Sequence, residues 1–476
     1  MIFRSSLYLI LLFISACSCD QYVKKEPFKA LNKQPNIILI LTDDLGYKDV
    51  GFNGSDDILT PNIDKISMEG INFTSAYVTH PYCSPSRAGL LTGRYQQRFG
   101  HEHNVPYQPK NSELGTSLDE VTLSEKLKDA GYNTYAIGKW HLGDHKSFLP
   151  HNRGFDKWFG FSGGNMNYWG MPSKNGRMHI QRNDSIIKPS SLTYLTDDFT
   201  KEALKNIKEN GDKPFFMFLS YNAPHSPDHT TLEYLEKTSH IEFGKRSVYG
   251  AMVAGIDKGV GQIDDLLLDL GIRKNTMIIF LSDNGGRLDA ADNGSFRGHK
   301  GMLFEGGIRV PFVISWPERL PVGIKYNDPI ISLDIFATCL AAAGQDIKNS
   351  DKLDGINLLP VLNKTNQQVL TRTLYWRVAN GEEYAIRKGR YKLIKSAYKN
   401  KRMLFDLEKD QMETNDISKE MPAIVSELSE HYKNWNNELM PPLWDDPHME
   451  NVVLEETNTK MIRKNSLSKK EQKHFE

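Results

Sequence analysis

Continuous apolar runs along the chain predict buried strands. The first run covers residues 36–41 (NIILIL), is rich in β-branched side chains, and ends at Thr42, Asp43 and Asp44. Further runs lie at 214–219, 277–281 and 312–316. Runs without polar alternation are typical of parallel strands that are covered on both faces.

Segments with the helical spacing of apolar residues lie between these runs, for example at 122–130 and 249–270. Gly131 follows the first of them, at a position where glycine commonly ends a helix. Alternating strands and helices favour an α/β domain with a large, mainly parallel sheet flanked by helices.

Beyond about Leu362 the pattern changes to short strands separated by turns. The strand candidates are 384–387, 391–394 and 403–406, and a helical stretch follows at about 423–439. This order favours a smaller C-terminal α+β subdomain with an antiparallel sheet. No internal repeat is evident.

The chain is too long, at 476 residues, for one small domain. We expect a lipoprotein signal peptide at 1–16, a spacer at 17–33 and a large α/β domain at 34–362. The smaller subdomain is expected at 363–457. The tail at 458–476 is rich in Lys, Glu and Ser, which predicts a solvated end.

The N-terminus has the features of an export signal. Arg4 gives a positive start, and the apolar run at 7–14 is too short to span a bilayer. The sequence then resembles a bacterial lipobox that ends at Cys17, the residue that would carry the lipid; an ordinary cleaved signal peptide is the alternative. Both interpretations predict an exported protein, and the lipobox predicts a membrane-anchored bacterial lipoprotein, periplasmic or at the cell surface.

Composition excludes some classes of protein. Lys+Arg and Asp+Glu both count 59, so the formal net charge is zero and lacks the basic excess usual for nucleic-acid binding. The four cysteines, Cys17, Cys19, Cys83 and Cys339, give no disulfide framework, because two lie at the processing site and Cys339 lies in an apolar run typical of a core. Cys83 needs a separate explanation.

Polar residues follow two of the predicted strands where they end. Asp43 and Asp44 follow the first strand, and Asp283 and Asn284 follow the run at 277–281. Ligands of open parallel sheets collect at this edge. Four oxygen donors suit a hard cation such as Ca²⁺ or Mg²⁺, although helix caps and turns are the common alternative use of these residue types.

Several cationic residues lie in Gly- and Pro-rich segments beside these strands, where active-site loops concentrate. They are Arg87, Lys139, His141, His225 and Lys300. Each taken singly is more often a solvated charge. Together with a metal they predict a pocket for a tetrahedral oxyanion, sulfate or phosphate.

At Cys83 the sequence resembles the type I sulfatases. Residues 83–87 (CSPSR) with 91–94 (LTGR) are similar to the signature that directs a maturation enzyme to oxidise the cysteine to formylglycine. The resemblance extends in order from Asp43 to Lys300, and into the C-terminal part at 404–407 with 413–416. It implies an alkaline-phosphatase-like fold and a sulfuric ester hydrolase.

The resemblance also implies a role for each matching residue. The Ca²⁺ ligands would be Asp43, Asp44, Asp283, Asn284 and the modified Cys83. One hydroxyl of the hydrated formylglycine would attack sulfur, and loss of a proton from the other would then release sulfate and restore the aldehyde. Arg87 would steady the diol, His141 would assist its deprotonation, His225 with Lys300 would protonate the leaving oxygen, and Lys139 would bind sulfate oxygens.

One segment of the sequence bears on the substrate. The aromatic and amide side chains at 165–169 (NMNYW) suit a sugar ring, but a loop packed on the core is an equal alternative. An exported sulfatase is expected to act on sulfated polysaccharides, either algal glycans such as ulvan or carrageenan, or glycosaminoglycans. The alternatives are a phosphate or phosphonate ester hydrolase of the same superfamily, and a non-catalytic lipoprotein that binds sulfated glycans.

Overall fold

A computed structural model describes residues 33–172, 178–347, 352–362, 372–396 and 401–445, with the backbone of 454–457 and 460–463. By their contacts, Met1–Lys33 and Gln34–Glu476 are separate units. The predicted signal peptide and Cys17 lie outside the described residues. Within the described part of the chain, no helix has the length and apolar character that a membrane span requires.

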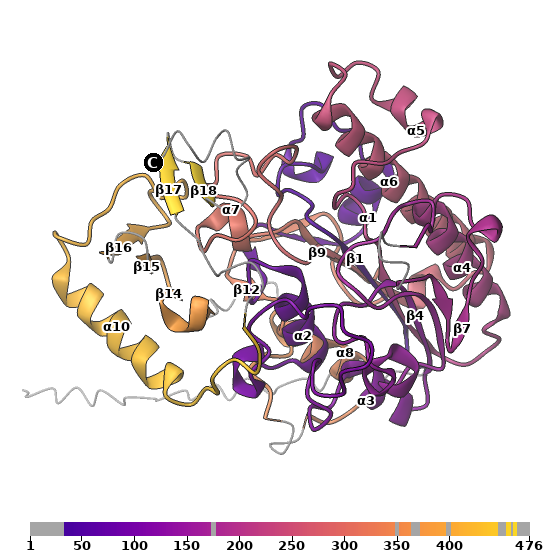
Figure 1. The fold of residues 1–476 in the computed structure, drawn as a ribbon, viewed down its shortest axis with the longest axis horizontal. Helices are drawn as coiled ribbons and strands as arrows, with labels where there is room; N and C mark the ends of the chain where they lie inside the picture. Colours follow the sequence, from indigo (N-terminus) through magenta and orange to yellow (C-terminus); the bar gives the residue numbers. More distant parts are fainter. Residues whose placement is uncertain are drawn as a thin grey trace, which may run out of the picture. The chain divides into compact units, whose positions relative to one another are not determined.

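Ten strands form the main sheet of the second unit, in the order β11-β2-β10-β9-β1-β8-β4-β5-β6-β7 (Figure 1). Their bounds are β1 Asn36–Thr42, β2 Ile71–Phe73, β4 Asn133–Lys139, β5 Lys157–Phe161, β6 Gln181–Arg182, β7 Ser185–Ile186, β8 Phe215–Ser220, β9 Thr276–Ser282, β10 Phe312–Ser315 and β11 Ile324–Tyr326. The central strands β9, β1, β8, β4 and β5 run parallel. A separate pair joins β3 Ala76–Tyr77 to β12 Ile330–Ile331.

The predicted buried strands are confirmed as β1, β8, β9 and β10. Every residue of β8 and β9 is buried, as expected for strands covered on both faces. β10 departs from the parallel arrangement and pairs antiparallel with β9. The carboxyl end of β10 therefore lies beside the amino end of β9, at the edge of the sheet opposite to the carboxyl end of β9.

Helices cover both faces of the sheet (Figure 1). Their bounds are α1 Pro61–Met68, α2 Cys83–Thr92, α3 Leu123–Asp129, α4 Leu195–Glu209, α5 Leu232–Lys237, α6 Lys245–Asp269, α7 Glu305–Ile308, α8 Asp334–Ala342, α9 Leu359–Leu362 and α10 Pro422–Asn436. The predicted helices at 122–130 and 249–270 are α3 and α6. Gly131 follows α3 with a φ of 90°, which explains why glycine stands there.

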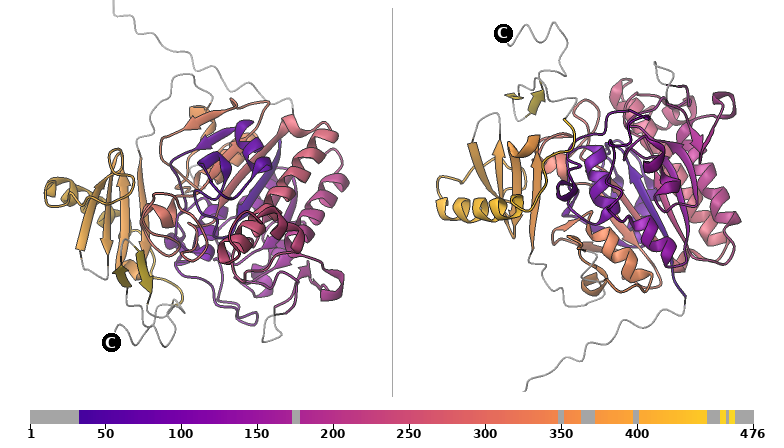
Figure 2. Two further views of the ribbon diagram at one scale, coloured as in Figure 1. Left: turned by 90° about the horizontal axis from the view of Figure 1, so that it is seen from above. Right: turned by 60° about the horizontal axis from the view of Figure 1, so that its bottom comes forward.

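The smaller subdomain has the predicted antiparallel sheet, in the order β13-β14-β15-β16. Its strands are β13 Thr373–Val378, β14 Glu383–Lys388, β15 Tyr391–Ser396 and β16 Lys401–Asp406. α10 packs against this sheet, and the two stand together at one side of the large α/β body (Figure 2). Within the predicted tail, strand β18 Lys460–Arg463 pairs antiparallel with β17 Leu454–Thr457.

Buried charges join the small sheet to the large body. Lys392 of β15 lies 2.8 Å from carboxylate oxygens of both Glu305, in α7, and Glu413, and all three side chains are fully buried. Burial raises the pKa of Glu413 to about 7, although Lys392 acts to lower it. The Tyr77 hydroxyl donates to Glu305 at 2.6 Å. Lys392 therefore helps to offset the desolvation of both carboxylates, and Arg309, 3.1 Å from Glu305, adds a second cation on that side.

We expect Lys392→Met to lower the free energy of unfolding by about 3–5 kcal/mol, because Glu305 and Glu413 lose their shared cation in a buried setting. Lys388→Met is the matched control, since that ammonium pairs with Glu427 at the surface and its loss should cost less than about 1 kcal/mol. Urea denaturation of both variants measures the difference. Equal losses of unfolding free energy in the two variants would show that the buried cation stabilises the protein no more than the surface cation does.

Candidate active site

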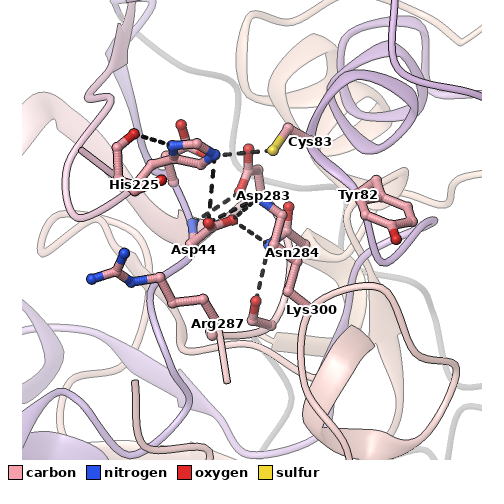
Figure 3. A network of polar contacts seen from close by, with 12 residues as sticks. Asp44, Tyr82, Cys83, His225, Asp283, Asn284, Arg287 and Lys300 are labelled. Atoms are coloured by element: carbon pink, nitrogen blue, oxygen red, sulfur yellow. Dashed lines mark hydrogen bonds and ion pairs between the residues drawn. The ribbon is translucent and has the colours of Figure 1, made fainter. Parts of the chain in front are cut away.

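The polar residues that follow β1 and β9 meet at one edge of the sheet, as predicted. The Asn284 amide donates to Asp44 Oδ1 at 2.8 Å, and the backbone amide of Asp44 donates to Asp283 Oδ1 at 3.3 Å. The side chains of Asp44, Asp283 and Asn284 converge on Cys83 (Figure 3). β1 and β9 are paired parallel neighbours, so their carboxyl ends deliver these groups to the same place.

Cys83 is the first residue of α2, so the end of this helix faces the strand-end carboxylates. Its thiol donates to Asp43 Oδ1 at 3.3 Å. Burial, with Asp283 and Asp43 nearby, raises the pKa of the Cys83 thiol well above its usual range. An unmodified thiol here is held in the protonated form and is a poor nucleophile.

The strand-end cluster fits a hard cation. Asn284 Oδ1 is buried and has no hydrogen-bond partner among the described residues. Burial, and then the neighbouring Asp43, raises the pKa of Asp283 to about 6, although Arg87 and Lys139 act to lower it. Ligand atoms of Asp43, Asp44, Cys83 and His225 lie within 4.8 Å of one another. This group could hold a metal. It includes His225, which was not among the metal ligands predicted from the sequence.

Arg87 lies one helical turn after Cys83, on the same face of α2, and is fully buried. Its Nε donates to Asp283 Oδ2 at 2.9 Å, and its Nη1 donates to the hydroxyl of Ser220 at 2.6 Å. Lys139 is the last residue of β4, and its ammonium donates to Asp43 at 2.6 Å. The expectation that Arg87 and Lys139 lie in loops is therefore wrong, because a helix and a strand hold them.

Lys300 and His225 both lie against the carboxylate of Asp44. The Lys300 ammonium lies 2.7 Å from Asp44 Oδ1, and His225 Nε2 lies 3.7 Å from Asp44 Oδ2. His225 Nδ1 is 2.5 Å from the carbonyl oxygen of Ser226, which can only accept, so Nδ1 carries the hydrogen and Nε2 faces the site. Burial, and then Lys300, lowers the pKa of His225 to about 3.

His141 completes the predicted set. Its backbone has a φ of 62°, and a Cβ added to Gly164 would lie 2.6 Å from its ring, so the loop around Gly164 is closed over the imidazole. Burial, followed by Lys139 and Arg87, lowers the pKa of His141 well below its usual range. A neutral imidazole has a bare ring nitrogen that can accept a proton, and the two cations beside it oppose that step until an anion is bound between them.

Two contributors were missed from the sequence. Ser220, at the end of β8, binds Arg87, but a single serine at a strand end gives no signal of that contact. Tyr168 was noted only as one of several sugar-binding candidates. It is buried, and its hydroxyl lies 2.7 Å from the carbonyl of Asn222 and 2.8 Å from that of His225, so it supports the loop that carries His225. Trp169 is the exposed aromatic of that segment.

The site thus places Arg87, Lys139 and Lys300 around three carboxylates at the head of α2, an arrangement suited to an oxyanion and a cation together. Residues 35–345 match the sulfatase family. The chain belongs to this family. Residues 295–438 also match the family described as N-sulphoglucosamine sulphohydrolase, C-terminal. The sulfatase is therefore a sulfuric ester hydrolase, as the resemblance at Cys83 implied.

Known sulfatases are similar over most of the chain. Mouse N-acetylgalactosamine-6-sulfatase is 36% identical over 75% of this chain and 71% of its own, and human steryl-sulfatase is 31% identical over 70% of each. The crystal structure of Ps i-CgsB in complex with k-i-k-neocarrahexaose is 36% identical with a TM-score of 0.82, and covers 87% of this chain and 95% of that one.

These neighbours also confirm the alkaline-phosphatase-like fold. A phosphonate monoester hydrolase from Silicibacter pomeroyi shares this fold at 16% identity, with a TM-score of 0.65 over 91% of this chain and 100% of that one. At that identity the likeness concerns the fold alone. Choice between sulfur and phosphorus esters must therefore come from the residues of each site.

Proposed function

We propose that this sulfatase is an exported, calcium-dependent enzyme that hydrolyses sulfate esters of polysaccharides or their oligosaccharides, with formylglycine made from Cys83 as its nucleophile. The observation that carries the proposal is Cys83 itself. It stands at the head of α2, beside Asp43, with Pro85 and Arg87 in the spacing of the modification signature. In the mature enzyme, the Cys83 sulfur position would be taken by a hydroxyl of hydrated formylglycine.

The residues around that position can then divide the work. Arg87 is fixed by Asp283 and Ser220 and faces the nucleophile, so it can hold the diol in place. Lys139 and Lys300 supply positive charge on either side of the reacting group. Such charge stabilises a transition state more than the ground state, because negative charge grows on the leaving oxygen and on the sulfuryl group.

Two histidines are placed to move protons. His225 presents a bare Nε2 to the site; this nitrogen is proposed to take up a proton once the anionic substrate is bound and to pass it to the leaving oxygen, with the Lys300 ammonium as the second donor. His141, held neutral by burial, is proposed to accept the proton whose loss releases sulfate. A maturation enzyme of the host would first have to oxidise Cys83.

The proposed cation is Ca²⁺, held by Asp43, Asp44, Asp283, Asn284 and the modified Cys83. Oxygen donors, a buried carboxylate cluster and the orphaned Asn284 Oδ1 support this choice. When bound, the ion supplies positive charge that polarises the sulfate ester and acidifies the nucleophile.

Two classes of sulfated glycan are the proposed substrates. Ps i-CgsB was solved with a neocarrahexaose, which supports a sulfated galactan of the carrageenan type. The similarity to N-acetylgalactosamine-6-sulfatase supports a glycosaminoglycan as the second candidate. The full set of nucleophile, cations and metal ligands argues against a protein that only binds glycans.

A panel of defined sulfated oligosaccharides tests the substrate, using protein whose Cys83 modification has been checked by peptide mass. We expect sulfate release from carrageenan-type oligosaccharides at least about tenfold faster, in kcat/KM, than from matched phosphate monoesters. Release of sulfate by ion chromatography and of phosphate by colorimetry gives both rates. A clear preference for the phosphate ester would establish the phosphatase alternative.

Export rests on the N-terminal pattern and is tested separately. We expect Cys17→Ser to move the protein from the membrane fraction to the soluble fraction, because lipidation requires the thiol of that cysteine. Cys19→Ser is the matched control and should stay with the membrane. Immunoblots of fractionated cells measure the partition. Unchanged partition of Cys17→Ser would favour an ordinary cleaved signal peptide.

A further inference from the structure

Behind the nucleophile, a buried chain of hydrogen bonds links three segments of the large body. The hydroxyl of Ser84 lies 2.6 Å from the carbonyl oxygen of His141 and 2.7 Å from His101 Nε2. His101 Nδ1 lies 3.1 Å from the hydroxyl of Thr116. The backbone amide of Ser84 donates to Asn104 Oδ1 at 3.1 Å.

The direction of these bonds follows from the carbonyl at one end. Since the carbonyl of His141 can only accept, the Ser84 hydroxyl donates to it and accepts from Nε2–H of His101. Nδ1 of His101 is then bare and accepts from Thr116. A single tautomer of His101 thus fixes the residue after Cys83 and, through it, the backbone of His141.

A C-terminal segment covers His101. We name residues 440–444, which follow α10, the strap. The Trp444 ring packs edge-on against His101 with centroids 4.8 Å apart, and its indole N–H lies 3.3 Å and 3.2 Å from the carbonyls of His103 and Asn104. Trp444 is only 9% exposed. The strap thus contacts the segment that positions Ser84.

Further contacts hold the strap in place. The backbone amides of Met440 and Leu443 donate to the carbonyls of Gln97 and Gly100 at 3.1 and 3.0 Å. Arg377, in β13, donates to the carbonyl of Met440 at 2.8 Å and to the buried carboxylate of Glu102. A Cβ added to Gly100 would lie 2.6 Å from Leu443 Cγ and 3.0 Å from the carbonyl oxygen of Pro441, so the strap packs directly on Gly100.

We propose that Trp444 and His101 are positioning residues for the sulfatase reaction, and that the strap sets the alignment of Cys83 with His141. The inference rests on the proposed nucleophile. Neither residue touches the reacting atoms; Trp444 orients His101, and His101 orients Ser84. Trp444 also lies beyond both family matches, which end at residues 345 and 438. Small displacements of a nucleophile are costly, so loss of the ring should lower turnover rather than substrate affinity.

The test compares Trp444→Ala with Trp316→Ala, both normalised to the fraction of protein that carries formylglycine. Trp316 is fully buried and follows β10 at the edge of the sheet opposite to the site, so its loss should cost stability alone. With 4-nitrocatechol sulfate, at a temperature where both variants are folded, we expect Trp444→Ala to lose at least about tenfold in kcat with KM changed less than about twofold. Trp316→Ala should keep the wild-type kcat.

A second pair of variants tests His101. His101→Ala should lose kcat as Trp444→Ala does, whereas His101→Gln, whose amide can replace the donor to Ser84, should regain most of it. Wild-type kcat in Trp444→Ala, a change confined to KM, or an equal loss in Trp316→Ala would overturn the proposal. Because the substrate is an aryl sulfate, this result does not depend on the identity of the natural glycan. Cys83→Ala is assayed in parallel, so that a wrong assignment of the nucleophile can be distinguished from a wrong role for the strap.

Discussion

Cys83→Ala is expected to abolish sulfate release, by about 10³-fold or more, while leaving the fold intact. The loss follows because alanine can form no hydrated aldehyde, and the nearby hydroxyls of Ser84 and Ser220 are engaged with the His141 carbonyl and with Arg87. The fold should persist because alanine suits the first turn of α2 and the thiol makes one polar contact, to Asp43. Ion chromatography of sulfate and thermal unfolding measure the two effects.

Cys339→Ala is the matched control for this experiment. That thiol is also fully buried, in α8, and contributes to packing alone. We expect it to lower the melting temperature and to retain turnover. Sulfatase activity in Cys83→Ala above the residual level would refute the assignment of the nucleophile.

Removal of the metal is expected to have the second largest effect. Chelation should lower turnover by roughly 10²-fold, and added Ca²⁺ should restore it, because Arg87, Lys139 and Lys300 alone would then offset the charge of the strand-end carboxylates and the sulfate ester. Ca²⁺ should also raise the melting temperature of the chelated protein, since a ligand that binds only the native state stabilises it. The shift in melting temperature measures metal binding independently of catalytic activity.

Two carboxylate variants make the thermal test specific. Asp283→Asn should lose the shift caused by Ca²⁺. Asp257→Asn should keep it, because the Asp257 carboxylate accepts from the backbone amides of Asn62 and Ile63 at the start of α1, away from the site. A shift that Mg²⁺ reproduces in full, or one that survives in Asp283→Asn, would contradict the proposed calcium site.

Much of the fold could be predicted because the buried strands have sequences that are unbroken apolar runs. The sense of β10 could not, since a strand that is buried on both faces has the same composition whether it runs parallel or antiparallel. The short strands β6 and β7 also gave no signal, as two-residue pairs carry no period.

Much of the candidate site could be predicted because its residues lie either at the ends of predicted strands or in the sulfatase signature around Cys83. The sequence did not show that Arg87 faces Asp283 from a helix, a contact between residues 196 positions apart. Nor did it show the link from Trp444 to His101, because a tryptophan near a C-terminus looks like any packing residue. Contacts of this kind depend on how distant segments pack, and a single sequence does not record that.

The cluster of Lys392, Glu305 and Glu413 has a consequence for the order of events during synthesis. Glu305 meets its first cation, Arg309, four positions later, but Lys392 follows only 87 positions after Glu305 and Glu413 follows 108 positions after it. A buried carboxylate is strongly unfavourable until its partner is in place. The large body therefore reaches full stability only once the C-terminal sheet, which supplies Lys392, has been made.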